Sequence, residues 1–191
     1  MIECDWFEED PEDEFSDAQR AFLAMLRERS RSWPCGPQHT QVVVPEGSSW
    51  PWCAVLFVNS QIENLEVISV GVCFDGASIL AAQIHNQCFY PFPEHQSRVA
   101  ILEAAGAPEH LGQLAADWLE HVLSRPVERR EWQHNGRTSY EYAFSDTDTD
   151  TDTGTALCAS GSADFRSPPD RIVCARGARP GETLEQRGHV R

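Results

Sequence analysis

The hydrophobic pattern is most regular between residues 107 and 125, where it predicts an amphipathic helix. Pro108 suits the first turn, because its missing N–H would have no helical partner there. Pro126 ends the helix at Arg125, since the residue before a proline is pushed out of the α region. The rest of the domain must supply the apolar surface that one face of this helix covers. Its apolar residues recur at the i, i+3, i+4, i+7 spacing of a single face: Leu111, Leu114, Ala115, Trp118, Leu119, Val122 and Leu123.

Two strands are predicted directly after this helix, around an Asn135-Gly136 turn. Asn-Gly between two strand-like runs is a strong hairpin signal, because both residues tolerate the positive φ that a two-residue turn requires. A turn of that length pairs Arg130 with Glu141 and Val127 with Phe144. The pattern therefore predicts both the hairpin and its register.

Six further elements are predicted upstream. Ser16 can cap a helix over residues 17–30, with Phe22, Leu23 and Leu26 on its buried side. Ser97 can cap a short helix over residues 98–105. Strands are expected at residues 41–45, 52–59, 65–74 and 78–85. The order α-β-β-β-β-α-α-β-β predicts an α+β fold, with a mostly antiparallel sheet and the helices packed on one face.

The register of the hairpin formed by residues 65–74 and 78–85 depends on its loop length. A two-residue Asp75-Gly76 turn would place the bulky residues of the two strands on opposite faces, whereas an odd-length loop would place them on the same face. A sheet covered on one side requires the odd loop, and central strands allow either. We favour the odd loop.

The net charge of −15 is concentrated at the ends of the chain. Residues 1–14 hold eight acids and no base, which predicts a disordered acidic segment in which Trp6 and Phe7 are candidates for docking. Residues 146–191 begin with an Asp-Thr repeat and then show no apolar periodicity, so we expect a disordered low-complexity tail. A single α+β domain is expected over residues 15–145.

Composition also excludes several classes of function. An acidic surface disfavours binding to nucleic-acid phosphates and favours basic partners. No apolar run approaches the roughly 18–20 residues that cross a bilayer. The acidic N-terminus is the reverse of a secretory signal peptide, so we expect a cytoplasmic protein with no membrane partner. Seven cysteines, most of them single residues in apolar strands, argue against structural disulfides.

The segments WLEHVLSRPVERREW and YEYAFSDT resemble a family of small proteins from streptomycetes and related actinobacteria. The resemblance covers residues 107–147 and extends more weakly to residues 67–85. It carries a structural pattern and not a catalytic one, because no activity is established for that family. What it implies is a bacterial cytoplasmic origin.

A zinc site or a cysteine nucleophile would have to be built around His85 and Cys88. Together with Cys73 and His95 they contain one H-x-x-C pair, whereas structural zinc typically uses two tight ligand pairs. As a nucleophile, Cys88 lacks a neighbouring Gly-rich turn that would stabilise an oxyanion. We therefore predict no metal ion and no nucleophile here.

The residues that could carry out acid–base chemistry or bind calcium are better explained as solvated surface residues. Asp117, Glu120 and His121 lie on the polar side of the predicted helix at 107–125, where charged residues are ordinarily solvated. The Asp-Thr repeat lacks the defined turn of a calcium loop. None of the common nucleotide, zinc-protease or hydrolase motifs occurs. No catalytic residue and no cofactor are predicted.

Aromatic residues in loop-like, proline-rich sequence are the most suggestive feature, because such residues are enriched at binding surfaces. We favour a non-enzymatic protein-interaction module, immunity- or antitoxin-like, that binds a basic partner by charge complementarity. The alternative is an enzyme or small-ligand-binding protein with a pocket between sheet and helices, lined by Trp52, Phe89, Tyr90 and His85. The candidate binding surface consists of Trp33, Trp50, Trp52, His85, Phe89, Tyr90 and Phe92.

Overall fold

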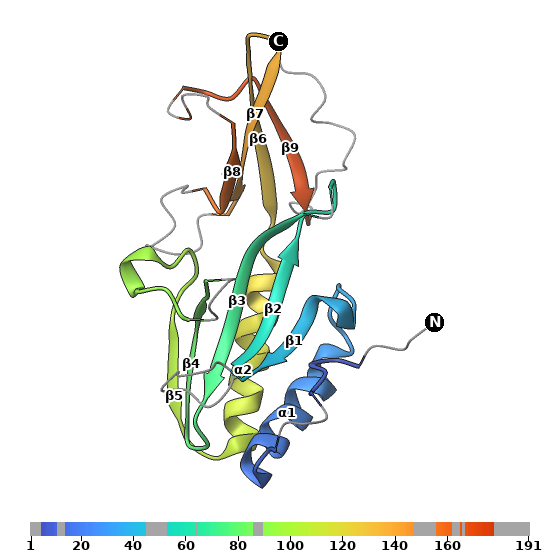
Figure 1. Ribbon diagram of the computed structural model, residues 1–191, viewed down its shortest axis with the longest axis vertical. Helices are drawn as coiled ribbons and strands as arrows, with labels where there is room; N and C mark the ends of the chain where they lie inside the picture. The colour runs from blue at the N-terminus through green and yellow to red at the C-terminus, as the bar shows by residue number, and fades with distance from the viewer. Residues whose placement is uncertain are drawn as a thin grey trace. The chain divides into compact units, whose positions relative to one another are not determined.

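The computed structural model describes residues 5–10, 14–44, 53–63, 65–85, 90–146, 156–161, 165 and 167–177. The chain divides into two compact units (Figure 1). The first consists of Met1–Val58 and Ser69–Leu123, and the second of Asn59–Ile68 and Ser124–Arg191. The span that the sequence assigns to one domain is thus shared between two units, each of which contains its own sheet.

The first unit begins with helix α1, Asp17–Ser30, whose start agrees with the prediction. Ser16 accepts a hydrogen bond from the backbone N–H of Gln19, and the Gln19 side chain accepts one from the Ser16 backbone, which completes a capping box. The buried face carries Phe22, whose ring stacks on Phe74 with the ring centroids 4.6 Å apart. This contact places α1 on the sheet.

Helix α2, Pro108–Ser124, confirms the predicted span but not its whole buried face. Leu114 and Trp118 are only half-buried, whereas Gly112 and Ala116 are buried. The reason is a close approach to α1: a Cβ on Gly112 would lie 2.9 Å from the backbone oxygen of Phe22. Small residues permit this contact between the helices, so the face turned toward α1 differs from the most hydrophobic stripe.

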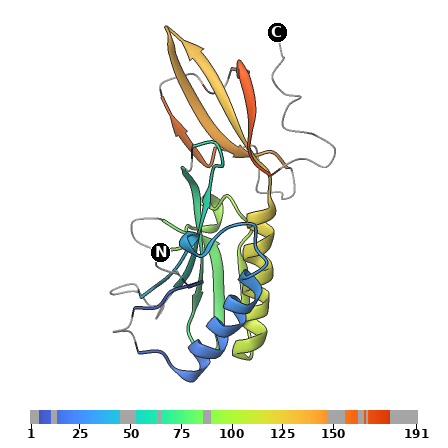
Figure 2. The same ribbon diagram turned by 90° about the vertical axis from the view of Figure 1, so that its right-hand side faces the viewer.

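Among the described residues, the sheet of the first unit has five strands in the order β1-β2-β3-β4-β5. Figure 2 shows both helices on the same face of this sheet, as predicted. Short 3-10 turns at Pro37–His39 and Glu94–Gln96 precede β1 and β5. The strands are β1 Thr40–Val43, β2 Cys53–Asn59, β3 Glu66–Phe74, β4 Ser78–Gln83 and β5 Leu102–Ala105.

Strand β5 replaces the short helix predicted over residues 98–105. It pairs antiparallel with β4, with Ser78 opposite Ala105 and Ala81 opposite Leu102. Leu102 and Ala104 are half-buried while Glu103 and Ala105 are exposed, which is the period of a strand. Pairing with β4 outweighs a weak local preference for helix, because a helix this short is marginal by itself.

The predicted odd-length loop between β3 and β4 is wrong, because the observed register requires a loop of even length. Phe74 pairs with Ile79 and Cys73 with Leu80, so the two bulky sets lie on opposite faces. Strand β3 is buried almost throughout, as a central strand covered on both sides, and such a strand allows either register. The Asp75 carboxylate sets the loop by accepting hydrogen bonds from the backbone N–H groups of Ala77 and Ser78.

In the described part of the second unit, four strands form a sheet in the order β8-β7-β6-β9. Its strands are β6 Val127–His134, β7 Arg137–Phe144, β8 Cys158–Ser160 and β9 Arg171–Arg176. The predicted β6–β7 register is confirmed, with Arg130 opposite Glu141 and Val127 opposite Phe144. Asn135 and Gly136 have φ values of 51° and 74°, as the two-residue turn requires.

Two segments of the tail that was expected to be disordered, β8 and β9, are strands. The expectation of disorder is therefore wrong for these residues. Strand β9 pairs with β6 from Glu131↔Arg171 to Val127↔Arg176, and β8 pairs with β7. Ala175 is buried and Arg176 donates a hydrogen bond to the backbone oxygen of Asn59. Residues 147–155, 162–164, 166 and 178–191 of the tail, and residues 1–4 and 11–13 near the N-terminus, lie outside the described residues. The α+β class with antiparallel sheets is confirmed.

Candidate functional site

The acidic segment Asp5–Asp10 is docked on the first unit through its two aromatic residues, as the sequence suggests. Phe7 is fully buried, and its N–H donates a hydrogen bond to Thr40 Oγ1 at 2.9 Å. Trp33 packs edge-on against both Trp6 and Phe7, with ring centroids 5.8 and 6.1 Å apart. The apolar side chains anchor the segment while its carboxylates stay near the surface.

Arg27 of α1 fixes the backbone of the same segment. Its guanidinium donates to the carbonyl oxygens of Trp6 and Phe7 at 3.0 and 2.7 Å and forms an ion pair with Glu9 at 2.6 Å. Phe7 has a φ of 51°, which is uncommon for a residue other than glycine. Aromatic burial and the arginine contacts hold this turn in place.

A groove of about 660 Å³ lies between this segment and strand β1. Its lining includes Gln41 and Val43 from one face of β1 and Thr40 and Val42 from the other. Successive side chains of a strand point to opposite faces, so a groove lined by both sets follows the edge of the strand. The remaining described lining residues are Asp5, Glu8, Glu9, Asp10, Pro37, Gln38, Val44 and Phe57.

The groove is acidic on one side and apolar on the other. Four of its described lining residues are carboxylates and none is basic. Asp5, Glu8 and Asp10 are exposed, whereas Glu9 is half-buried beside Arg27. Val44 is 46% exposed, and Val43 and Phe57 are partly buried. Such a surface attracts a cation and also offers apolar contact.

The predicted aromatic surface is only partly brought together. Trp33 is buried and belongs to the cluster with Trp6 and Phe7, so it supports the acidic segment and does not face solvent. His85 and Phe92 lie together, with ring centroids 5.8 Å apart. Tyr90 is beside them, because its backbone oxygen accepts from the His85 N–H, and its side chain is 45% exposed. Trp50, Trp52 and Phe89 lie outside the described residues.

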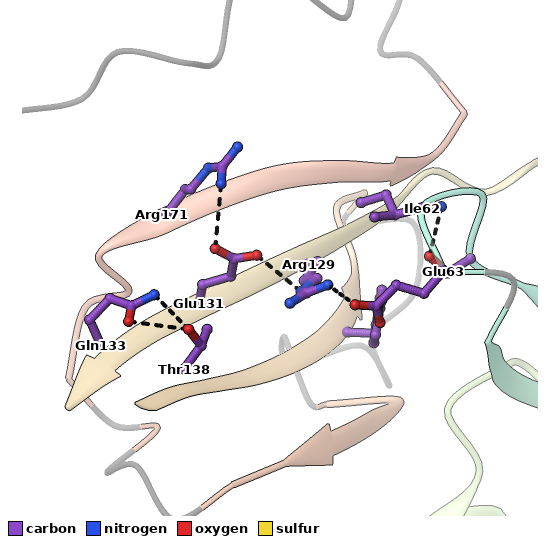
Figure 3. A network of polar contacts seen from close by, with 9 residues as sticks. Ile62, Glu63, Arg129, Glu131, Gln133, Thr138 and Arg171 are labelled. Atoms are coloured by element: carbon purple, nitrogen blue, oxygen red, sulfur yellow. Dashed lines mark hydrogen bonds and ion pairs between the residues drawn. The ribbon is translucent and has the colours of Figure 1, made fainter. Parts of the chain in front are cut away.

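The second unit carries a polar network on its sheet (Figure 3). Arg129 bridges Glu63 and Glu131, and Arg171 lies 3.8 Å from the other oxygen of Glu131. Arg129 Nε is 3.1 Å from Glu131 but makes no hydrogen bond, so this contact is an ion pair only. Burial lowers the pKa of Arg129, but the hydrogen bond to Glu63 and both carboxylates outweigh it and raise that pKa.

Tyr142 completes the network by donating a hydrogen bond to Glu63 at 3.1 Å. Burial raises the pKa of Tyr142, so its hydroxyl stays protonated near neutral pH. On the opposite face of β6, Arg130 lies between Glu128 and Glu141 at 2.8 and 3.1 Å. Each arginine thus neutralises carboxylates that the sheet partly buries, and we interpret both groups as structural.

The remaining candidates for chemistry are the acidic residues of α2 and the cysteines. Asp117 and Glu120 both pair with Arg29 of α1, at 2.7 and 3.1 Å. Cys73 is buried in the sheet, and Cys88 lies outside the described residues. Burial raises the pKa of Cys158 to about 11, which keeps it a thiol at neutral pH. Within the described ranges, no three His, Cys, Asp or Glu side chains are grouped as metal ligands.

Comparison with protein-family models, curated proteins and solved structures finds no match for this chain. Among the residues that the structure describes, no helix is both long and apolar enough to traverse a bilayer. The groove is therefore the feature of the described residues that bears on function. Sequence reasoning located its acids in residues 1–14 but did not pair them with β1, because only the docking of Phe7 brings the two together.

Proposed function

We propose that the chain is a non-enzymatic protein-interaction module that binds a basic partner in the acidic groove beside β1. One observation carries the proposal: a docked segment places three exposed carboxylates, and a fourth that pairs with Arg27, along a groove whose described lining contains no base. Most of the chain's excess negative charge lies at its ends. Carboxylates from the N-terminal end line this groove. A neutral or acidic partner would gain nothing from that arrangement.

Charge complementarity of this kind acts mainly on the association rate and on partner choice. An exposed ion pair contributes about 0.2–1 kcal/mol, so several carboxylates are needed for a useful effect. At physiological ionic strength the screening length is about 8 Å, so carboxylates on one short segment act on the same cation-rich ligand. The apolar side chains of the groove would add contact area after the encounter.

The concrete form of this proposal is an immunity- or antitoxin-like protein of the cytoplasm that neutralises a basic protein partner. Nucleic acid is disfavoured as the partner, because its phosphates would meet carboxylates in this groove. The alternative, a small-ligand pocket lined by Trp52, Phe89, Tyr90 and His85, is less well supported. Of its described members, His85 and Tyr90 are both exposed, whereas a ligand pocket encloses its lining side chains.

The test uses a capped, fluorescently labelled hexapeptide of alternating arginine and valine, and the same peptide with glutamate in place of arginine. We expect the basic peptide to bind and the acidic one not to bind. The double variant Asp5→Asn/Glu8→Gln removes two exposed groove carboxylates without a large change in shape. At about 0.2–1 kcal/mol per pair, it should weaken binding roughly 2- to 30-fold, measured by fluorescence anisotropy.

The matched control is Glu94→Gln/Glu103→Gln, which removes two exposed carboxylates of the same unit, one of them on β5 at the opposite edge of the sheet. Its affinity for the basic peptide should stay within about twofold of the unmodified chain by the same reckoning. Equal weakening by the two double variants would show general charge attraction and would refute a specific role for the groove.

A further inference from the structure

We infer that the basic partner presents an extended segment, which adds to the outer edge of β1 as a new strand. This inference rests on the proposed function and specifies how the groove is used. The partner segment would carry basic side chains on one side and apolar side chains on the other. Addition of a strand provides affinity through backbone hydrogen bonds, and alternate side chains provide specificity.

Among the residues that the structure describes, strand β1 is the end of its sheet and is paired on one side only, with β2. The pairs run from Thr40↔Leu56 to Val43↔Cys53. Beyond that ladder, residues 41–44 make no backbone hydrogen bond to any other residue that the structure describes. The Phe7 N–H of the acidic segment donates to a side chain, Thr40 Oγ1, and not to the backbone of β1.

The residues of β1 do not protect this edge. Natural sheets blunt an open edge with charged side chains, proline, a bulge or a covering element. Residues 40–44 read Thr-Gln-Val-Val-Val, with neither charge nor proline, and the β1–β2 register is regular. The acidic segment and β1 both line the groove, and the hydrogen bond from Phe7 that joins them goes to the Thr40 side chain. An unprotected edge beside a groove is a template for one more strand.

The walls of the groove specify the chemistry of that strand. Val43 and Phe57 share one face of the sheet and offer apolar contact, and the segment Asp5–Asp10 offers carboxylates. Because side chains of an added strand alternate between two directions, every second residue can be basic and the others apolar. The four residues of β1 span about 13 Å at ~3.3 Å per residue, which matches a partner segment of about four to six residues.

A second copy of this chain is a poorer occupant of the same edge. Pairing β1 with β1 of another copy would bring two sets of four groove carboxylates together. Like charges across an interface oppose binding, whereas a basic segment removes that repulsion. Charge therefore selects a different, cationic chain.

The test compares the basic hexapeptide with two N-methylated forms, one methylated on its three arginine amides and the other on its three valine amides. In a strand, alternate N–H groups point to the same side, so only one of the two forms blocks pairing with β1. We expect that form to bind at least tenfold more weakly than the other, which should stay within about threefold of the parent peptide. Hydrogen exchange at residues 41–44 should slow when the parent peptide binds.

Equal affinities of the two methylated forms, whether both bind or neither does, would overturn strand addition. If the parent peptide still binds in that case, and Asp5→Asn/Glu8→Gln weakens its binding, the proposed function holds and only strand addition is rejected. If the parent peptide binds no better than the acidic peptide, both proposals fail. Concentration-dependent protection of residues 41–44 in the protein alone would assign the edge to a second copy and would also overturn the inference.

Discussion

Substitution of Gly112 tests how closely the two helices of the first unit pack. A Cβ at this position would lie 2.9 Å from both Met25 Cβ and the backbone oxygen of Phe22, and 3.2 Å from Met25 Cγ. Contacts under 3.0 Å require the helices to separate, because a backbone oxygen cannot rotate away. Gly112→Ala therefore introduces one methyl group where there is no room for it.

The expected change in the free energy of unfolding is the difference of two effects. Alanine has a higher helix propensity than glycine, which stabilises an α-helix by about 1 kcal/mol. Overpacking a tight contact typically costs about 1–3 kcal/mol, and two contacts below 3.0 Å favour the upper part of that range. Gly112→Ala should thus destabilise the chain by about 1–2 kcal/mol net. Gly112→Val should cost at least ~2 kcal/mol more, since its additional methyl groups enlarge the clash.

Urea unfolding followed by tryptophan fluorescence measures this change as a shift of the midpoint at constant slope. Gln113→Ala is the control, because Gln113 is half-buried and its side chain bonds only to Asp117 among the described residues. That change should cost under about 0.5 kcal/mol. If Gly112→Ala instead stabilises the chain by the full helix-propensity gain, the helices do not touch at Gly112 and the explanation of the shifted buried face of α2 is wrong.

Two further predictions concern the other unit and the β3–β4 loop. A chain ending at Asp146 lacks β8 and β9 and should be roughly 2–4 kcal/mol less stable than a chain ending at Gly177, through the lost hydrogen bonds and burial. Equal urea midpoints of these two chains would contradict the pairing of β8 and β9 with the β6–β7 hairpin. The pKa of Asp75 is lowered from its usual 3.8, first by the hydrogen bond from the Ser78 hydroxyl and then by the Ala77 N–H. Its stabilising effect is therefore fully present above about pH 4 and is lost as pH falls through the lowered pKa. Solvent screens this exposed carboxylate, so Asp75→Asn should destabilise by only about 0.2–0.5 kcal/mol at pH 7 and by less at pH 2. An equal loss at both pH values, in thermal melts, would show that the carboxylate charge is not involved.

The amino-acid sequence alone determined the elements whose signals are local. The α1 cap at Ser16, the span of α2 and the register set by Asn135-Gly136 were all predicted correctly, because each depends on residues a few positions apart. The α+β class followed from the order of these elements. The docking of Trp6 and Phe7 was also anticipated, since large aromatic residues in an acidic segment have little reason to remain in water.

Only the tertiary structure decided features in which distant segments compete for the same surface. Strand β5 and the Gly112 contact override local preferences because pairing with β4 and close approach to α1 outweigh them. Strand β9 carries a weak strand signal of its own, yet it completes a sheet that β6 leaves open. The groove depends on the same kind of long-range contact. Composition placed carboxylates near the N-terminus, but only the burial of Phe7 beside Thr40 positions them along the edge of β1.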